Sequence, residues 1–119
     1  MLTIRAAQVA VLAEDRVRRL HAWLLPHLRQ HFAARLAGTS DEELRALVEE
    51  GVARARALGA TRTATIGSFV HLRIVFGPGL EALPWAARAL ADRGFSGDRR
   101  IEHLSRRARA ALRAPRRPS

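Results

Sequence analysis

Apolar residues recur at helical spacing along most of the chain. From about Ile4 to Ala37 they return every three to five residues, close to the period of one face of an α-helix. These positions are Val9, Leu12, Val17, Leu20, Leu24, Leu28, Phe32 and Leu36. Because proline removes a backbone donor and clashes with the preceding turn, Pro26 predicts a kink or a break just before it, near Leu24 and Leu25. Gly38 and Thr39 are expected to end the segment.

A second helix is predicted between Ser40 and Gly59. Ser40 followed by Glu43 forms a capping box, in which the hydroxyl accepts a hydrogen bond from the third amide of the helix. Gly59 suits the position just after the last turn, where the backbone often adopts a positive φ. The apolar face consists of Leu44, Leu47, Val48, Val52 and Ala55.

A third helix is expected from about Arg62 to Phe76, with Thr61 as its cap. Its second half carries almost only apolar residues, which is typical of a helix buried in the centre of a domain. The β-branched residues in this stretch also permit a strand over residues 69–76. Neighbouring helices make the strand the less favoured alternative.

The remaining sequence predicts two further helices. Gly77-Pro78-Gly79 indicates a turn, and Pro84 suits the first turn of a short fourth helix. Trp85, Ala86 and Leu90 are expected to pack inward, and Gly94 to end this region. Ser96 is a candidate cap for a fifth helix, whose apolar face is Ile101, Leu104, Ala108 and Leu112. We therefore expect an all-α, compact single-domain bundle of about five helices over residues 1–112, with a flexible Arg- and Pro-rich tail at residues 113–119.

The composition fits one domain of modest size that stays in solution. The chain has 119 residues, of which 48% are hydrophobic, so one small core can form. It contains no cysteine, which excludes disulfides and thiolate zinc sites. Glu14, Asp15 and Arg16 interrupt the first apolar stretch, so no signal peptide is predicted, and no apolar run approaches the length of a membrane span. A cytoplasmic location is expected.

The net charge of +10 is concentrated near the C-terminus. Residues 1–97 hold 13 Arg against 9 acidic residues, whereas residues 98–119 hold 8 Arg against 2 acidic residues. All basic residues are Arg, a pattern typical of GC-rich genomes, which weakens the inference from charge alone. The C-terminal arginines are still candidates for contact with a nucleic acid or another anionic partner. They are Arg99, Arg100, Arg106, Arg107, Arg109, Arg113, Arg116 and Arg117.

The sequence does not favour a metal site or a DNA-binding helix-turn-helix. His27 and His31 have the four-residue spacing of metal ligands on a helix, but two ligands do not complete a site, and His71 is only a conditional third. Gly59 between two helices suggests a helix-turn-helix, yet the apolar positions of the third helix are displaced by one residue, and this helix lacks the polar face that a recognition helix needs. Neither a metal nor a cofactor is predicted.

No catalytic constellation is apparent. Ser40 and Ser96 are explained as helix caps, and the acidic cluster from Asp41 to Glu50 belongs to the start and solvent face of one helix. Gly77-Pro78-Gly79 lacks the lysine and the following helix of a phosphate-binding loop. We therefore expect a protein that is not an enzyme.

Several short motifs resemble a group of small helical bacterial proteins encoded beside type VI secretion or polymorphic-toxin components. The resemblance covers about residues 1–92 and is weakest in the first segment, around Gln8 and Leu28-Arg29-x-x-Phe32. The motifs are Val48-x-x-Gly51-x-x-Arg54-Ala55-x-x-Leu58-Gly59, Phe69-x-x-Leu72, Phe76-Gly77-Pro78-x-Leu80-Glu81, Leu83-Pro84-Trp85-Ala86 and Leu90-Ala91-Asp92. It implies a non-catalytic accessory, adaptor, chaperone or immunity-like partner of a secreted effector.

The chain departs from that group at two places. Leu58 stands where the group tends to have an aromatic residue before the glycine. Leu80-Glu81 replaces an aromatic–Asp pair, and the Asp-Pro that follows in the group is missing. These departures weaken any expectation of a specific acidic site.

A helical domain without a pocket motif usually acts by presenting a surface, so binding to a cognate protein is the main hypothesis. Trp23, Trp85 and Phe95 are candidate contact anchors, because large aromatic residues are enriched at binding hot spots. Packing in the core is the alternative for each of them. The sequence leaves the oligomeric state open.

Overall fold

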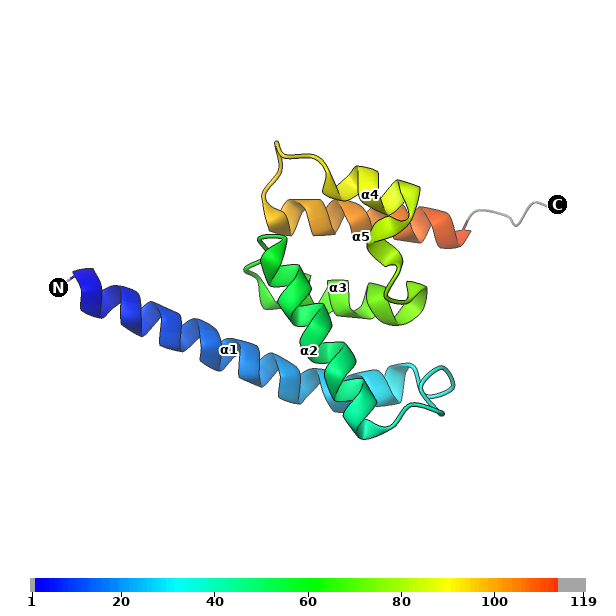
Figure 1. The fold of residues 1–119 in the computed structure, drawn as a ribbon, viewed down its shortest axis with the longest axis horizontal. Helices are drawn as coiled ribbons and strands as arrows, with labels where there is room; N and C mark the ends of the chain where they lie inside the picture. The colour runs from blue at the N-terminus through cyan, green and yellow to red at the C-terminus, as the bar shows by residue number, and fades with distance from the viewer. Residues whose placement is uncertain (1, 114–119) are drawn as a thin grey trace, which may run out of the picture. The chain divides into compact units, whose positions relative to one another are not determined.

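The computed structural model describes residues 2–113, and it describes the side chains of residues 14–113. The described residues form five α-helices, one 3-10 helix and no strand (Figure 1). In order they are α1 (Leu2–His31), α2 (Asp41–Ala57), α3 (Thr63–Phe76), η1 (Leu80–Ala82), α4 (Pro84–Leu90) and α5 (Gly97–Arg113). The predicted all-α class is confirmed, and the alternative strand over residues 69–76 is wrong. Of the predicted tail, Arg113 ends α5 and residues 114–119 lie outside the described residues.

The chain divides into two compact units, residues 1–50 and 51–119, and the boundary falls within α2. Each unit has its own buried apolar side chains. In the first unit they are Leu20, Leu24, Leu28, Leu36, Leu44 and Val48. In the second unit the largest are Phe69, Ile66, Val70, Leu80, Ile101 and Leu104.

In the first unit, α1 continues through Pro26, so of the predicted kink or break the break is wrong. Pro26 and the preceding-turn residue Ala22 are both exposed, which lets water solvate the carbonyl that proline leaves without an amide donor. The helix ends at His31, earlier than predicted, and residues 32–38 form turns. Arg29 stabilises this segment, because its guanidinium donates to the carbonyls of Leu36, at 2.7 Å, and Thr39.

Both predicted ends of α2 are confirmed by hydrogen bonds. The Ser40 hydroxyl accepts from the amide of Glu43 at 3.1 Å, as a helix cap does. At the other end Gly59 has a φ of +97° and donates to the carbonyl of Arg56 at 2.9 Å. The amide of Ala60 donates to the carbonyl of Ala55 at 3.1 Å. These two bonds form a Schellman motif, which requires the left-handed conformation that glycine supplies.

In the second unit, the second half of α3 is covered: Phe69, Val70 and Ile74 are buried and the rest of residues 69–76 are half-buried. It packs against α5 and η1, and the side chain of Val70 lies against Gly51 of α2. The prediction that Thr61 caps this helix is wrong, because Arg62 occupies the cap position and makes no side-chain cap bond. Asp98, at the start of α5, accepts from the amides of Thr61 and Arg62, which precede the first residue of α3.

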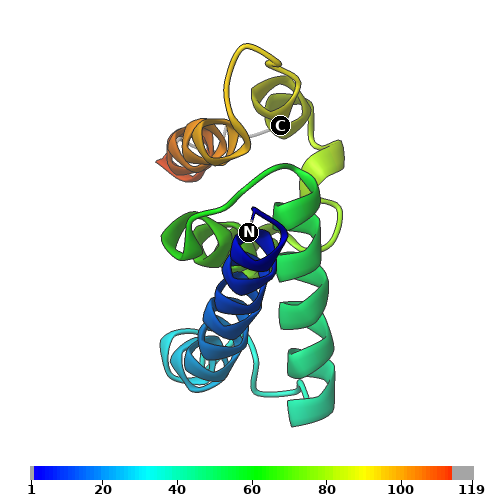
Figure 2. The ribbon, with the colours of Figure 1, turned by 90° about the vertical axis from the view of Figure 1, so that its left-hand side faces the viewer.

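α4 and α5 lie side by side, as Figures 1 and 2 both show. Pro84 is the first residue of α4, and Ala86 and Leu90 are buried as predicted. The Ser96 hydroxyl accepts from the amide of Arg99 at 3.3 Å, which confirms it as the cap of α5. Leu112 was expected on the apolar face of α5, but its side chain is 61% exposed. The buried face ends one turn earlier, at Ala108.

Candidate interaction surfaces

The aromatic side chains on α1 form a stacked row. The rings of Trp23 and His27 are 4.3 Å apart between centroids and nearly parallel, at 18°. His27 stacks in turn on His31 at 5.6 Å and 10°. The three residues are four positions apart, which places them on one side of the helix. Trp23 is 56% exposed, so the candidate anchor at this position lies on the surface.

The other two candidate anchors are partly covered by their own unit. The Trp85 ring meets Phe76 edge to face at 5.2 Å, which ties the start of α4 to the end of α3. Phe95 contacts His103 edge to face at 6.3 Å, and the guanidinium of Arg99 lies 5.0 Å above its ring. Both aromatic residues are half-buried. Packing within the second unit therefore accounts for Trp85 and Phe95 better than a contact with a partner does.

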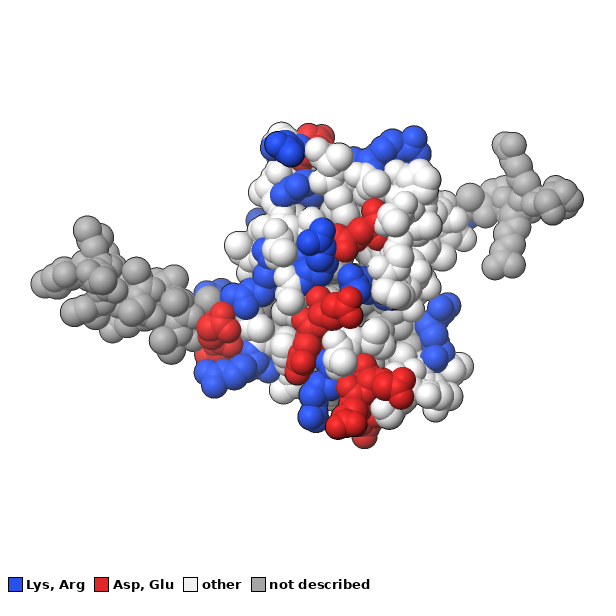
Figure 3. All heavy atoms as spheres, in the orientation of Figure 1, with Lys and Arg blue, Asp and Glu red and all other residues white. Residues whose placement is uncertain are grey.

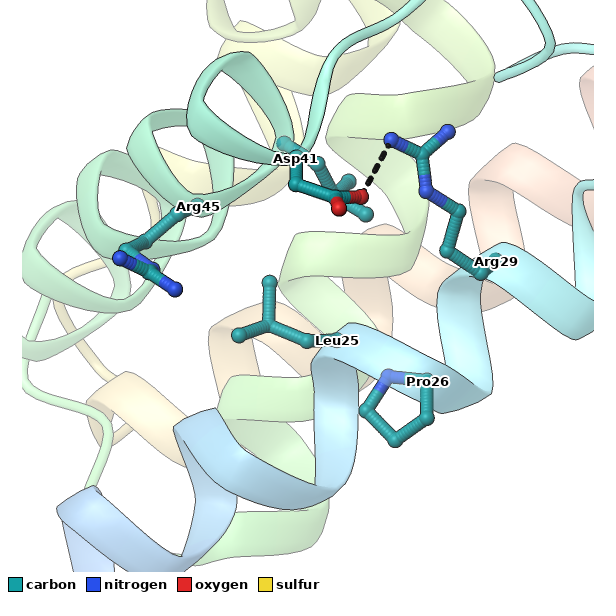
Figure 4. Close-up of a pocket in the computed structure, with 6 residues that line it drawn as sticks. Leu25, Pro26, Arg29, Asp41 and Arg45 are labelled. Carbon is teal, nitrogen blue, oxygen red and sulfur yellow. Dashed lines mark hydrogen bonds and ion pairs between the residues drawn. The ribbon is translucent and has the colours of Figure 1, made fainter.

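A small pocket lies between α1 and the first turns of α2 (Figure 4). Leu25 points into it, Arg29 pairs with Asp41 at 2.9 Å on one side, and Arg45 lies on the other. The Arg29 side chain is fully engaged, since it also holds the carbonyls of the preceding turn. The Arg29 contacts therefore stabilise the connection between the two helices, and among the described residues that line the pocket Arg45 is the cationic group left for a ligand.

The C-terminal arginines predicted as one anionic-partner site do not behave alike. Arg100 is half-buried and donates to the carbonyls of Leu58, at 2.9 Å, and Leu90, at 3.2 Å, so its assignment to the surface site is wrong. Four others are exposed, and their side chains make no ion pair or hydrogen bond within residues 14–113. These are Arg106, Arg107, Arg109 and Arg113. Arg116 and Arg117 lie outside the described residues.

The sequence does not predict two polar clusters, of which the first is partly exposed and the second partly buried. The Nε of Arg54 donates to both carboxylate oxygens of Glu81, at 2.8 and 2.9 Å. The guanidinium of Arg73 lies 3.7 Å from the same carboxylate. Asp98 accepts from the amides of Thr61 and Arg62, each at 3.1 Å, and from the Thr61 hydroxyl at 2.8 Å. Both clusters join segments that are distant in the sequence, so no local spacing signals them. Each connects elements of the second unit.

The environment of Asp98 shifts its ionisation. Burial of the carboxylate raises its pKa, but the hydrogen bonds from the Arg62 amide and from Thr61 and Thr65 outweigh this effect. The net result is a pKa below the ordinary carboxyl value. Asp98 is therefore charged at neutral pH, and its role is to hold the start of α3 against the start of α5.

The surface charge is mixed on the face drawn in Figure 3, where acidic side chains gather over the first turn of α2, which carries Asp41, Glu42 and Glu43. The described residues contain no group of three or more His, Asp or Glu side chains able to hold a metal ion. His27 and His31 therefore stack on each other, and no third side chain within the described residues completes a metal site with them. Within the described part of the chain, no helix is long and apolar enough to cross a membrane.

No family model, curated protein or solved structure that was compared with this chain matches it.

Proposed function

We propose that this chain is a non-catalytic protein-interaction module that binds one cognate protein through the Trp23 face of α1. We define this face by Trp23, His27 and His31. The observation that carries the proposal is the exposure of Trp23, at 56%, on a ring stack that holds it in place. The resemblance described above suggests the role of an adaptor, chaperone or immunity-like partner of a secreted effector in the cytoplasm.

An exposed, immobilised tryptophan is well suited to binding. Trp buries more apolar area than other side chains, and water contact with such a surface is unfavourable. Because His27 already stacks on the indole, a partner that covers Trp23 orders little further side-chain freedom. Tryptophans in such positions commonly contribute about 2 kcal/mol or more to binding.

Affinity capture with the full chain tests this function. The tagged chain is immobilised and exposed to a lysate of its native cell, and retained proteins are quantified against the bait. We expect one protein retained in stoichiometric amount, and we expect Trp23→Ala to weaken its affinity by about 30-fold, the factor that about 2 kcal/mol represents.

Leu112→Ala is the matched control for this substitution. Leu112 is also a large exposed apolar residue, at 61%, but it lies on α5 in the other unit. Its truncation is expected to leave capture unchanged. Equal retention by the wild type and Trp23→Ala, or equal loss with both variants, contradicts the proposal.

A second candidate function is the binding of nucleic acid or another anionic surface through α5. One observation favours it: Arg106, Arg107, Arg109 and Arg113 are exposed without an acidic neighbour bound to any of them in the described region. Intramolecular charge pairing therefore does not explain these four arginines. A loss of polyanion binding when they are replaced together tests this function.

A further inference from the structure

A groove lies between α3 and α5, two helices that pack against each other within the second unit. Its volume is about 400 Å³. Both helices contribute small or polar side chains to it, and α5 adds two arginines at the rim. The residues that bear on a ligand are Ser68, Ser105, Arg106, Arg109 and Glu102.

The two serines bring hydroxyl groups to the groove from opposite walls. The Ser68 hydroxyl donates to the carbonyl of Ala64 at 3.0 Å, and the Ser105 hydroxyl donates to the carbonyl of Ile101 at 3.1 Å. Each bond is made to the preceding turn of the same helix, where the carbonyl also has its normal helical partner. A hydroxyl rotates freely about its C–O bond, so each serine can redirect its proton to an incoming acceptor.

The electrostatics of the groove favour an anion. Arg106 and Arg109 are exposed and make no ion pair within the described region. The one carboxylate in the lining, Glu102, is already paired with Arg62 at 3.4 Å. Two free cations and two hydroxyls are thus available to the same ligand, which is the donor set that binds phosphate oxygens.

The groove opens onto a longer row of arginines. Arg99, Arg106, Arg109 and Arg113 are separated by seven, three and four residues, which places them on one side of α5. At 1.5 Å per residue, the row is about 21 Å long. One strand of a nucleic acid carries a charge about every 3.4 Å, so several phosphates can lie along such a row.

Other phosphate-bearing partners fit this surface less well. A phosphopeptide presents one phosphate, which leaves most of the row unused. Insertion into a lipid surface needs an exposed apolar face beside the cations. Ile101, Leu104 and Ala108 of α5 are buried, and the exposed Leu112 by itself does not form such a face. None of the described residues that line the groove is aromatic, so these residues offer bases no ring on which to stack.

We propose that α5 and the α3–α5 groove bind the sugar–phosphate backbone of a nucleic acid without sequence preference, with one phosphate held by Ser68, Ser105, Arg106 and Arg109. This inference rests on the second candidate function and adds to it a defined phosphate position. Arg99 and Arg113 contact neighbouring phosphates along the strand.

The test is fluorescence anisotropy of a labelled oligonucleotide of about 20 nucleotides, which is longer than the arginine row. Single-stranded and duplex forms are titrated with the full chain between about 50 and 200 mM salt. We expect Arg106→Ala/Arg109→Ala to weaken binding at least tenfold at low salt. The negative slope of log K against log salt should become shallower, by about 1.8 for the duplex and about 1.4 for the single strand, because two phosphate contacts are lost.

Arg88→Ala/Arg93→Ala is the matched control for charge. These two arginines are exposed in the same unit but lie outside α5 and the groove. We expect the control to leave the slope unchanged. Equal losses in the two double variants would show that net charge alone drives binding, and they overturn the inference.

The serines separate the groove from the wider function. We expect Ser68→Ala/Ser105→Ala to weaken binding about threefold with an unchanged salt slope, because the lost groups are neutral. If oligonucleotide binding is weakened only by substitutions of Arg99, Arg107 and Arg113, the phosphate position in the groove is refuted and the second candidate function stands. Absence of oligonucleotide binding by the wild type, or tighter binding to a singly phosphorylated peptide or to phosphatidylserine vesicles, refutes the inference as well.

Discussion

Gly97 at the start of α5 lies close to the backbone of Leu58 and Gly59, just after α2. A Cβ built on Gly97 would overlap the carbonyl carbon of Gly59 and lie 2.5 Å from the carbonyl oxygen of Leu58. Both neighbours are backbone atoms, so they cannot rotate away as a side chain does. The contact lies beside the Asp98 carboxylate, and together they fix the start of α5 against the end of α2 and the start of α3.

We expect Gly97→Ala to lower the free energy of unfolding by about 3 kcal/mol, because the helices must separate to admit one methyl group. Urea denaturation followed by circular dichroism measures the change. Gly79→Ala is the control, since nothing lies within 4 Å of its added Cβ and its φ is −83°. Similar effects of the two substitutions would show that the close approach does not constrain the fold.

Asp98 makes stability depend on acid pH. Because its pKa is lowered in the folded state, its stabilising contribution is fully present above the ordinary carboxyl pKa of about 4. The contribution disappears as the pH falls through the lower, folded-state value. At pH 7 we expect Asp98→Asn to cost about 1–2 kcal/mol, since charge-assisted bonds to two amides and a hydroxyl are weakened.

The measurement is urea denaturation of the wild type and Asp98→Asn at a series of pH values. The difference between them should be constant from neutral pH to about pH 5 and should shrink below about pH 4. A difference that stays the same down to the lowest pH would mean that the Asp98 charge does not contribute to stability.

At the scale of the elements, the features that the sequence predicts correctly depend on neighbours a few residues away. Ser40 and Glu43 belong to one helical turn, and Gly59 ends α2 through bonds to the same helix. Thr61 does not cap α3 as predicted, because its hydroxyl donates to Asp98, which lies 37 residues away. No local preference identifies such a partner. Leu112 is a similar case. The apolar pattern predicts which side of α5 it occupies, but not that the elements packed against this helix end before they reach it.

Pro26 is a second case in which local preference was overruled. The sequence predicts a kink or a break near Leu24 and Leu25, but the helix is not broken there. Leu24 and Leu28 on either side of Pro26 are both fully buried and belong to one continuous helix. Burial of these two leucines outweighs the cost of proline within a helix, which is about 3 kcal/mol.

We expect Pro26→Ala to raise the free energy of unfolding by about 2 kcal/mol. Alanine restores one helical hydrogen bond and removes the clash, although the loss of proline also frees the unfolded chain and offsets part of the gain. Thermal denaturation and helical circular dichroism measure the effect. Gln30→Ala, another exposed position of α1, is the control and should change stability by less than about 0.5 kcal/mol. A destabilised Pro26→Ala protein would contradict this account of α1.

At the scale of the whole molecule, the two proposed surfaces belong to different units. The Trp23 face lies in residues 1–50, and the arginine row and groove lie in residues 51–119. Substitutions in one surface therefore serve as controls for the other. Trp23→Ala should leave oligonucleotide binding unchanged, and Arg106→Ala/Arg109→Ala should leave capture of the cognate protein unchanged.

The sequence indicated residues of both surfaces, but it did not distinguish surface from core. Trp23, Trp85 and Phe95 were equivalent candidates by residue type, and only tertiary packing separates the exposed Trp23 from the half-buried other two. Arg100 was grouped with the surface arginines because charge is visible in a sequence, whereas its two carbonyl acceptors are not. The groove itself depends on the packing of α3 on α5 and has no local signal.

The most direct test of the central claim is acrylamide quenching of Trp23 fluorescence. The chain has two tryptophans, so Trp85→Phe leaves Trp23 as the single reporter, and Phe retains the edge-to-face contact with Phe76. We predict that Trp23 is readily quenched in the free chain and becomes protected when the captured cognate protein is added. A Trp23 that is already shielded in the free chain, or that stays equally accessible in the complex, would contradict its role as the binding anchor.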